Sequence, residues 1–294
     1  MDGVQNMNNL YMIIDSNFLC YRAVNAIREM KLSHNDLRTE IIFSFILQIH
    51  KLVKILDCNK IIFTWDSIIN FRKDLFPGYK HKEFENEETQ EEKEKRQLFY
   101  LQFSILRSEV LPMMGFKNIY HQTGMEADDI MAVITKDYPG KRFVIVSRDN
   151  DLFQLLTPNV WMYDPVVKKT ITKGSFIDKW GIVPSRWGEV KCMAGCKGDK
   201  VPNVPSVAEK TAIKYLKKRL KVTTKAFAKI KESADLIKRN EKLVVLPFEG
   251  TKSIEIKEEQ LFLIDFMKTF EKYGFESQLK GYELKQWQDS FGLF

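Results

Sequence analysis

The fold is decided by LYMIID at residues 10–15, KIIFTWD at 60–66 and RFVIVSRD at 142–149. The apolar residues in these segments are continuous rather than alternating, and many are β-branched or aromatic, which is typical of strands buried on both faces of a parallel sheet. Apolar residues at helical spacing predict helices at about residues 36–56, 88–112, 126–137 and 209–220. The sequence therefore predicts an α/β fold.

The composition is that of an ordinary globular protein. Of the 294 residues, 44% are hydrophobic and 29% are charged, which excludes disordered, collagen-like and coiled-coil chains. The longest apolar-rich stretch, near residues 41–55, is interrupted by Ser44, Gln48, His50 and Lys51, so it falls short of the roughly 18 apolar residues that a membrane span needs. The N-terminal MDGVQNMNNLYMIID lacks the basic start of a secretory signal. We therefore expect an intracellular protein with no membrane partner.

The four cysteines favour neither a disulfide framework nor a structural zinc site. Cys20, Cys58, Cys192 and Cys196 are scattered and form no CxxC pair. On a helix, Cys192 and Cys196 would share one face, where buried thiols are the simpler interpretation. The four histidines are also dispersed, which argues against a zinc site or a histidine base.

Basic residues are concentrated late in the chain. Residues 197–242 hold fourteen Lys or Arg and five acids, a net charge of +9, whereas the whole chain carries +7. Such a segment is either a solvated helix face or a surface that grips phosphates. An opposite, glutamate-rich run occupies residues 83–94 and has the composition of a solvated connection.

Carboxylates follow the predicted strands and gather in two clusters. Asp15, Asp66 and Asp149 end the three strands, so their side chains would lie at one edge of a parallel sheet. The clusters are GMEADDI at 124–130 and SRDND at 147–151, which helix capping explains in part. Carboxylates a few ångströms apart repel by roughly 4 kcal/mol per pair, so such clusters require protons or cations. Oxygen ligands without histidine select Mg²⁺ or Mn²⁺, which indicates two-metal phosphodiester hydrolysis.

The chain resembles the 5′-3′ exonuclease and flap endonuclease family of bacteriophages and bacteria, which includes the 5′ nuclease domain of DNA polymerase I. The resemblance runs from about Tyr11 to about Leu216. The joint order and spacing of six segments carry it: MIIDSN at 12–17, FTWDS at 63–67, FRKDLFPGYK at 71–80, GMEADDI at 124–130, VSRDNDLFQLL at 146–156 and GCKGDKVPNVPSVAEKTA at 195–212.

The resemblance implies a PIN-like parallel-sheet nuclease core at residues 1–190, with a helical arch at about 80–110. A helical lobe with a helix-three-turn-helix (H3TH) motif and a C-terminal cap would follow at 191–294. It implies catalytic roles for Lys80, Asp149 and Asp128. The implied metal ligands are Asp15, Asp66, Glu126, Asp128, Asp129, Asp149, Asp151 and Asp199. The implied DNA-binding residues are Arg72 for phosphate, Tyr79 for base stacking, and Lys80, Lys93, Lys95, Arg96, Lys200, Asn203, Ser206, Lys210, Thr211 and Lys214.

The same resemblance implies two Mg²⁺ ions, for which Mn²⁺ could substitute, and leaves room for K⁺ at the H3TH loop. The expected partner is DNA with a 5′ flap, nick, gap or free 5′ end, in replication or repair. We expect a monomer in the cytoplasm of a bacterial cell or a phage-infected host.

The late motif departs from the family pattern. Cys196 stands where the family usually has a metal-site aspartate, and neutral sulfur is a poor ligand for a hard ion. Asn203, Ser206 and Ala208 replace glycines, and Glu83 replaces a frequent arginine. Two alternatives therefore stay open: a protein that binds DNA flaps or junctions with impaired catalysis, and a PIN-type ribonuclease.

Overall fold

The computed structural model describes residues 10–26, 31–81 and 89–293, and the chain divides into two compact units. Unit 1 consists of Met1–Trp65, Phe84–Tyr120 and Glu255–Phe294, and unit 2 consists of Asp66–Glu83 and His121–Ile254. A domain boundary near residue 190 therefore stays a prediction, because these units divide the chain at other places. Glu83 and the first part of the glutamate-rich run lie outside the described residues.

Two parallel strands form the centre of unit 1. β1 (Leu10–Asp15) pairs with β4 (Ile61–Trp65) so that Met12 lies opposite Ile61 and Asp15 opposite Thr64. Except for Leu10, the apolar side chains of both strands are almost fully buried, as expected for strands covered on both faces. The strands predicted at 10–15 and 60–66 are thus confirmed.

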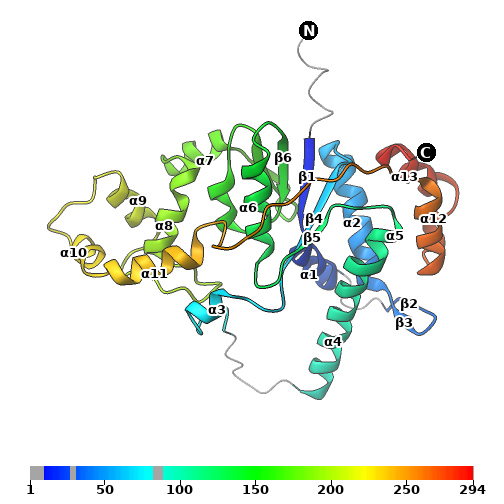
Figure 1. The fold of residues 1–294 in the computed structure, drawn as a ribbon, viewed down its shortest axis with the longest axis horizontal. Helices are drawn as coiled ribbons and strands as arrows, with labels where there is room; N and C mark the ends of the chain where they lie inside the picture. Colours follow the sequence, from blue (N-terminus) through cyan, green and yellow to red (C-terminus); the bar gives the residue numbers. More distant parts are fainter. Residues whose placement is uncertain (1–9, 27–30, 82–88, 294) are drawn as a thin grey trace, which may run out of the picture. The chain divides into compact units, whose positions relative to one another are not determined.

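The helices of unit 1 bury their apolar residues to different extents. α2 (Glu40–Leu56) buries Ile42, Phe45 and Ile49, and its helical spacing was readable in the sequence. α4 (Gln90–Ile105) begins at a capping box of Thr89 and Glu92 and continues through a π-helical turn (Leu106–Val110) into α5 (Leu111–Met113) (Figure 1). This run confirms the helix predicted at about 88–112. The remaining elements before α4 are α1 (Ser16–Ala26), β2 (Ser33–His34) and β3 (Leu37–Arg38).

The C-terminal residues complete the core of unit 1. They form α12 (Leu263–Lys272), a 3₁₀ turn (Glu276–Gln278) and α13 (Gly281–Phe291). Trp287 stacks on His50 of α2 with ring centroids 4.0 Å apart, and Phe266 lies 6.1 Å from Phe116. These aromatic contacts stabilise unit 1. The C-terminal cap therefore packs in unit 1, whereas the sequence was interpreted as grouping it with the basic helical lobe at 191–294.

Unit 2 contains a second parallel pair and an antiparallel edge. β6 (Arg142–Val146) pairs in parallel with β7 (Val160–Asp164), and β8 (Lys169–Ile171) is antiparallel to β7. β6 confirms the third predicted strand, although it ends at Val146, three residues before Asp149. A short β5 (Ile119–His121), whose first two residues belong to unit 1, was not predicted, and neither were β7 and β8.

Most of unit 2 is helical. Its elements are α3 (Arg72–Leu75), α6 (Ala127–Asp137), 3₁₀ turns at Asn150–Leu155 and Pro184–Arg186, α7 (Lys173–Trp180), α8 (Trp187–Ala194), α9 (Glu209–Leu216), α10 (Lys225–Glu232) and α11 (Ala234–Val244). α6 and α9 confirm the helices predicted at about 126–137 and 209–220. Within the described ranges, no helix combines the length and the apolar character needed to cross a membrane.

α8 ends before Cys196, so Cys192 and Cys196 do not share a helix face. Gly195 follows the helix with φ of 70°, and a Cβ atom there would lie 2.5 Å from the Val201 carbonyl oxygen. Only glycine fits this close approach. Cys192 is buried in an apolar cluster with Tyr79, Val201 and Leu243.

Candidate active site

Lys80 lies at the centre of the predicted site. Its Nζ atom lies 2.5 Å from Glu126 Oε1 and 3.6 Å from Asp199 Oδ1. Its backbone N–H donates to the Asp199 carbonyl oxygen over 2.8 Å. The residue has φ of 48°, a left-handed conformation that a non-glycine residue adopts only when its surroundings hold it there. Burial lowers the pKa of Lys80, but the nearby carboxylates outweigh burial and raise it. The amine is therefore a fixed positive charge.

The protein itself neutralises Glu126. This residue is 7% exposed and caps the N-terminus of α6. Its Oε1 accepts hydrogen bonds from Asn70 Nδ2 at 2.8 Å and Lys80 Nζ, and its Oε2 accepts one from the Tyr79 hydroxyl at 2.9 Å. Burial raises the pKa of Glu126, but Lys80 and Arg72 outweigh it, so the pKa is lowered. Glu126 is thus stable as a carboxylate.

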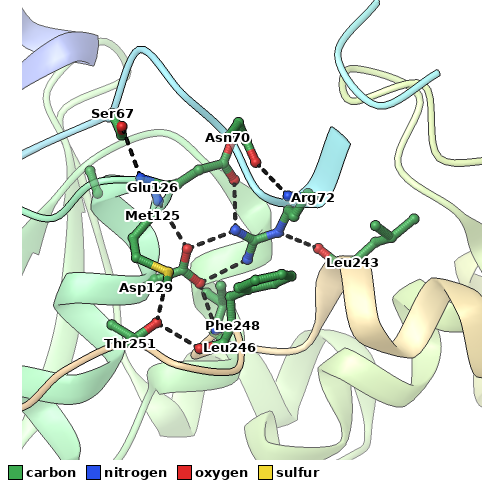
Figure 2. Close-up of polar contacts among 12 residues, drawn as sticks. Ser67, Asn70, Arg72, Met125, Glu126, Asp129, Leu243, Leu246, Phe248 and Thr251 are labelled. Carbon is green, nitrogen blue, oxygen red and sulfur yellow. Dashed lines mark hydrogen bonds and ion pairs between the residues drawn. The ribbon is translucent and has the colours of Figure 1, made fainter. Parts of the chain in front are cut away.

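Arg72 and Asp129 form an ion pair in the interior of unit 2 (Figure 2). The exposed fraction is 1% for Arg72 and 0% for Asp129. Two guanidinium nitrogens donate to the two Asp129 oxygens over 2.7 and 2.8 Å, and Arg72 Nε donates to the Leu243 carbonyl. Asp129 also accepts the backbone N–H groups of Glu126 and Phe248. All lone-pair directions of Asp129 are therefore used by protein donors.

The three residues Arg72, Asp129 and Tyr79 thus differ from their predicted roles. Arg72 was expected to contact phosphate and Asp129 to bind metal, but the two bind each other inside the fold. Tyr79 was expected to stack on a base, but it is 2% exposed and its hydroxyl is directed at Glu126. Sequence order could not reveal this, because burial depends on the packing of α3 and α11 around the pair.

Asp149 and Asp151 lie together at the start of a 3₁₀ turn after β6. Asp149 is exposed and caps the turn by accepting the Asp151 N–H over 2.7 Å. Asp151 is 7% exposed, and its Oδ1 lies 3.0 Å from Nζ of Lys191. Burial, and then the charge of Asp149, raises the pKa of Asp151. Lys191 was not predicted as a site residue; the available signal was a lysine on the buried face of α8, since buried lysines are almost always paired.

Cys196 and Asp199 come from one tight turn. Backbone hydrogen bonds of 3.0 and 2.9 Å between Cys196 and Val201 close this turn. The Cys196 Sγ donates to Asp199 Oδ2 over 3.3 Å. One ligand atom each from Asp151, Cys196 and Asp199 lies within 4.8 Å of the others. Burial raises the pKa of Asp199 and of the Cys196 thiol.

The other predicted acids are placed as follows. Asp66 Oδ1 accepts the Ala127 N–H over 2.9 Å, and burial raises the pKa of Asp66. Asp128 is half-buried in the first turn of α6. Asp15 belongs to unit 1, where it ends β1 and accepts the Phe18 N–H at the start of α1.

The predicted DNA-binding residues fall into two groups. Lys200, Asn203 and Ser206 are exposed in the segment before α9, and Lys210, Thr211 and Lys214 lie on α9 itself, with both lysines exposed. Lys93, Lys95 and Arg96 are exposed on α4 of unit 1. The segment before α9 keeps its turn without the usual glycines, because Ser206 adopts φ of 65° and Asn203 Nδ2 donates to the carbonyls of Val204 and Val207.

The site therefore contains two kinds of carboxylate. Glu126 and Asp129 are balanced by Lys80 and Arg72. Asp66, Asp151 and Asp199 have raised pKa values because burial is not fully compensated by protein cations. A hard divalent cation fits the oxygen atoms of these acids and of Asp149, whereas the sulfur of Cys196 does not fit such an ion.

The chain is similar to known proteins over most of its length. A model of the 5′-3′ exonuclease N-terminal resolvase-like domain matches residues 10–181, more than half of the chain. The 5′-3′ exonuclease of Buchnera aphidicola is 28% identical over 250 residues, covering 84% of this chain and 79% of that protein. DNA polymerase I of Rhizobium leguminosarum is 36% identical over 148 residues, covering 50% of this chain but only 14% of the polymerase.

Solved structures show the same fold. The 5′-exonuclease of bacteriophage T5, determined with bound zinc, has a TM-score of 0.69 at 19% identity and covers 97% of this chain and 99% of that one. Flap endonuclease-1 of Methanococcus jannaschii has a TM-score of 0.59 at 14% identity, covering 97% and 93%. The match over residues 10–181 includes the strands, Lys80 and most of the acids described above. This chain belongs to the 5′-3′ exonuclease family.

Proposed function

We propose that this protein is a Mg²⁺-dependent 5′ nuclease that hydrolyses DNA phosphodiesters at 5′ flaps or free 5′ ends. The observation that carries the proposal is the position of Lys80, whose amine contacts Glu126 and Asp199. A fixed cation among carboxylates would attract a scissile phosphate and stabilise charge that develops on it.

The acidic residues would have two further roles, which are metal binding and the positioning of Lys80. Asp66, Asp149, Asp151 and Asp199 would hold divalent ions, with Asp15 and Asp128 as further proposed ligands. Bound Mg²⁺ ions would supply an activated water and charge stabilisation at the phosphate. Glu126 would position the amine of Lys80, and the Arg72–Asp129 pair would fix Glu126 through its backbone N–H.

The basic residues of the H3TH segment support a duplex substrate. Lys200, Lys210 and Lys214 are exposed near the turn that carries Asp199, and their charges would neutralise backbone phosphates. We propose DNA with a 5′ flap, nick, gap or free end as the substrate, K⁺ as a ligand of this segment, and action as a cytoplasmic monomer in replication or repair.

A cleavage assay tests the proposal. A 5′-labelled flap duplex and a matched single-stranded RNA are incubated with Mg²⁺ or with EDTA. We expect cutting of the DNA near the flap base, only with Mg²⁺. Asp149→Asn should abolish cutting and keep DNA binding, while Asp178→Asn, an exposed aspartate on α7, serves as the matched control.

The outcomes separate the alternatives. Tight flap binding without cutting would favour a junction-binding protein, an interpretation that the replacement of a carboxylate by Cys196 supports. Preferential cutting of the RNA would favour a PIN-type ribonuclease. Retained cleavage by Asp149→Asn would contradict the assigned metal ligands.

A further inference from the structure

The thiol of Cys196 has a fixed direction. Gly195 and the two backbone hydrogen bonds to Val201 hold the turn on both sides of the residue. The Sγ atom donates to Asp199 Oδ2, 3.3 Å away, while the residue also packs against the edge of an apolar cluster. Cys192, four residues earlier, is a buried member of the same cluster and does not belong to the group of Asp151, Cys196 and Asp199.

A buried carboxylate faces the same space. Asp151 is 7% exposed, and its Oδ1 lies 3.0 Å from the ammonium of Lys191, with which it forms an ion pair. Its ligand atom, the Cys196 sulfur and one Asp199 oxygen all lie within 4.8 Å of one another. Three potential ligand atoms from two separate segments of the chain thus lie close together. This arrangement differs from a single cysteine and from a cluster of acids on the surface.

This ligand set does not match a hard ion. Mg²⁺ prefers six oxygens in near-ideal octahedral geometry and keeps several waters. Thiophilic divalent ions accept sulfur and oxygen together in smaller shells of about four ligands. A thiol binds such an ion as the thiolate and releases its proton to solvent. With the ion bound, the three residues carry three negative charges, and the ion competes with Lys191 for Asp151.

We propose that Asp151, Cys196 and Asp199 form a cation site that selects thiophilic divalent ions, such as Zn²⁺, over Mg²⁺. The inference rests on the proposed function, because it assigns a different ion to one of the two metal positions of that nuclease. The other position, with oxygen ligands only, keeps its preference for hard ions.

Cadmium serves as the probe, because a Cd²⁺–thiolate bond absorbs in the ultraviolet through charge transfer. The full chain, free of other metals, is titrated with CdCl₂ and the absorbance is recorded. We expect one charge-transfer band that saturates at one Cd²⁺ per chain. Cys196→Ser should remove it, and Cys192→Ser, the matched control outside the site, should keep it. Zn²⁺ should displace the bound Cd²⁺, whereas Mg²⁺ at equal concentration should not.

A second variant measures selectivity directly. Cys196→Asp restores an oxygen ligand, so the ratio of the Kd for Mg²⁺ to the Kd for Cd²⁺ should fall by at least about tenfold. The inference is overturned if the wild type shows no charge-transfer band, if Cys196→Ser keeps it, or if Cys196→Asp leaves the ratio within about twofold. DNA cleavage is measured separately. If Cd²⁺ binds through Cys196 but the protein shows no Mg²⁺-dependent cleavage, the proposed nuclease function is refuted. If Mg²⁺-dependent cleavage occurs but the charge-transfer band is absent, only the thiophilic site is refuted.

Discussion

Arg72 and Asp129 bind each other through two hydrogen bonds of 2.7 and 2.8 Å, and neither side chain has more than 1% exposure. The pair connects α3, the N-terminus of α6 and the end of α11, since Arg72 also reaches the Leu243 carbonyl. One of the acids in GMEADDI therefore stabilises the fold, while its neighbour Glu126 contacts Lys80. Adjacent acids in one motif have separate physical roles.

Replacing Asp129 by Asn tests the structural role. The variant would leave the Arg72 guanidinium buried without its counter-charge, so we expect the free energy of unfolding to fall by about 3–5 kcal/mol. Chemical denaturation in EDTA measures this loss. Asp137→Asn, at the exposed end of the same helix, should change stability by less than about 0.5 kcal/mol. A loss for Asp129→Asn no larger than that of the control would contradict the assignment.

Replacing Lys80 by Met tests the charge at the centre of the site. We expect the single-turnover rate of flap cleavage to fall by about 100-fold or more, because a fixed cation would no longer face the developing phosphate charge. Lys73→Met, an exposed lysine on α3, is the matched control and should retain the rate. If both variants cleave equally fast, Lys80 does not act at the phosphate.

Strands and long helices were predictable because their signal is local. The segments 10–15, 60–66 and 142–149 are continuous apolar runs, and β1, β4 and β6 occupy them. β7 was missed although its sequence VWMYD is a largely buried apolar run with a local signal of the same kind. β8 was missed because it is mostly exposed, with little apolar content in KTI, so pairing with β7 rather than its own sequence defines it. A strand that forms because a neighbouring strand pairs with it cannot be predicted from its own residues alone.

The candidate site was predictable in chemistry but not in detail. The resemblance to the exonuclease family placed Lys80, Glu126 and Asp199 in one site, and the structure brings them together. It could not tell that Arg72 lies inside the fold, since an arginine is charged whether it meets phosphate or a buried aspartate. Lys191 was missed for the same reason, because its role is set by the ion pair with Asp151, which is forty residues away in the chain.

Ser206 and Asn203 replace glycines in different ways, which gives opposite predictions. Ser206 has φ of 65°, so Ser206→Gly should remove left-handed strain and raise the free energy of unfolding by about 0.5–1 kcal/mol. Asn203→Gly should lower it by about 1 kcal/mol or more, because two hydrogen bonds to backbone carbonyls are lost. Denaturant unfolding compares the two variants. Equal effects would show that the turn does not depend on these contacts.

Reversing the charge of Lys210 and Lys214 tests the basic surface on α9. The double change to Glu should weaken duplex binding and lower the slope of log K against log salt by about 2, one for each lost phosphate contact. Lys225 and Lys229 on α10 provide a matched double change to Glu. If the α9 variant keeps the wild-type slope, these lysines face solvent in the complex.

The pH dependence of stability tests the uncompensated carboxylates. Burial raises the folded-state pKa of Asp199 above its unfolded value, so the folded state binds the proton more tightly and the ionised form opposes folding at neutral pH. Without divalent ions, this group should make the free energy of unfolding rise as pH falls from the folded-state pKa towards the unfolded value. Asp199→Asn should remove that gain and be more stable than wild type at neutral pH in EDTA.

The difference between Asp199→Asn and wild type is measured by denaturation in EDTA at several pH values, so that the contribution of His50, which titrates in both proteins, cancels. Asp178→Asn, which changes an exposed carboxylate on α7, should parallel wild type at every pH. Adding Zn²⁺ in place of EDTA at neutral pH should stabilise wild type more than Asp199→Asn, because an ion that binds the native state adds its binding free energy to stability. If the free energy of unfolding depends on pH in the same way for wild type and Asp199→Asn, protein cations already balance the charge of Asp199. That result would contradict the prediction of a divalent ion beside this residue.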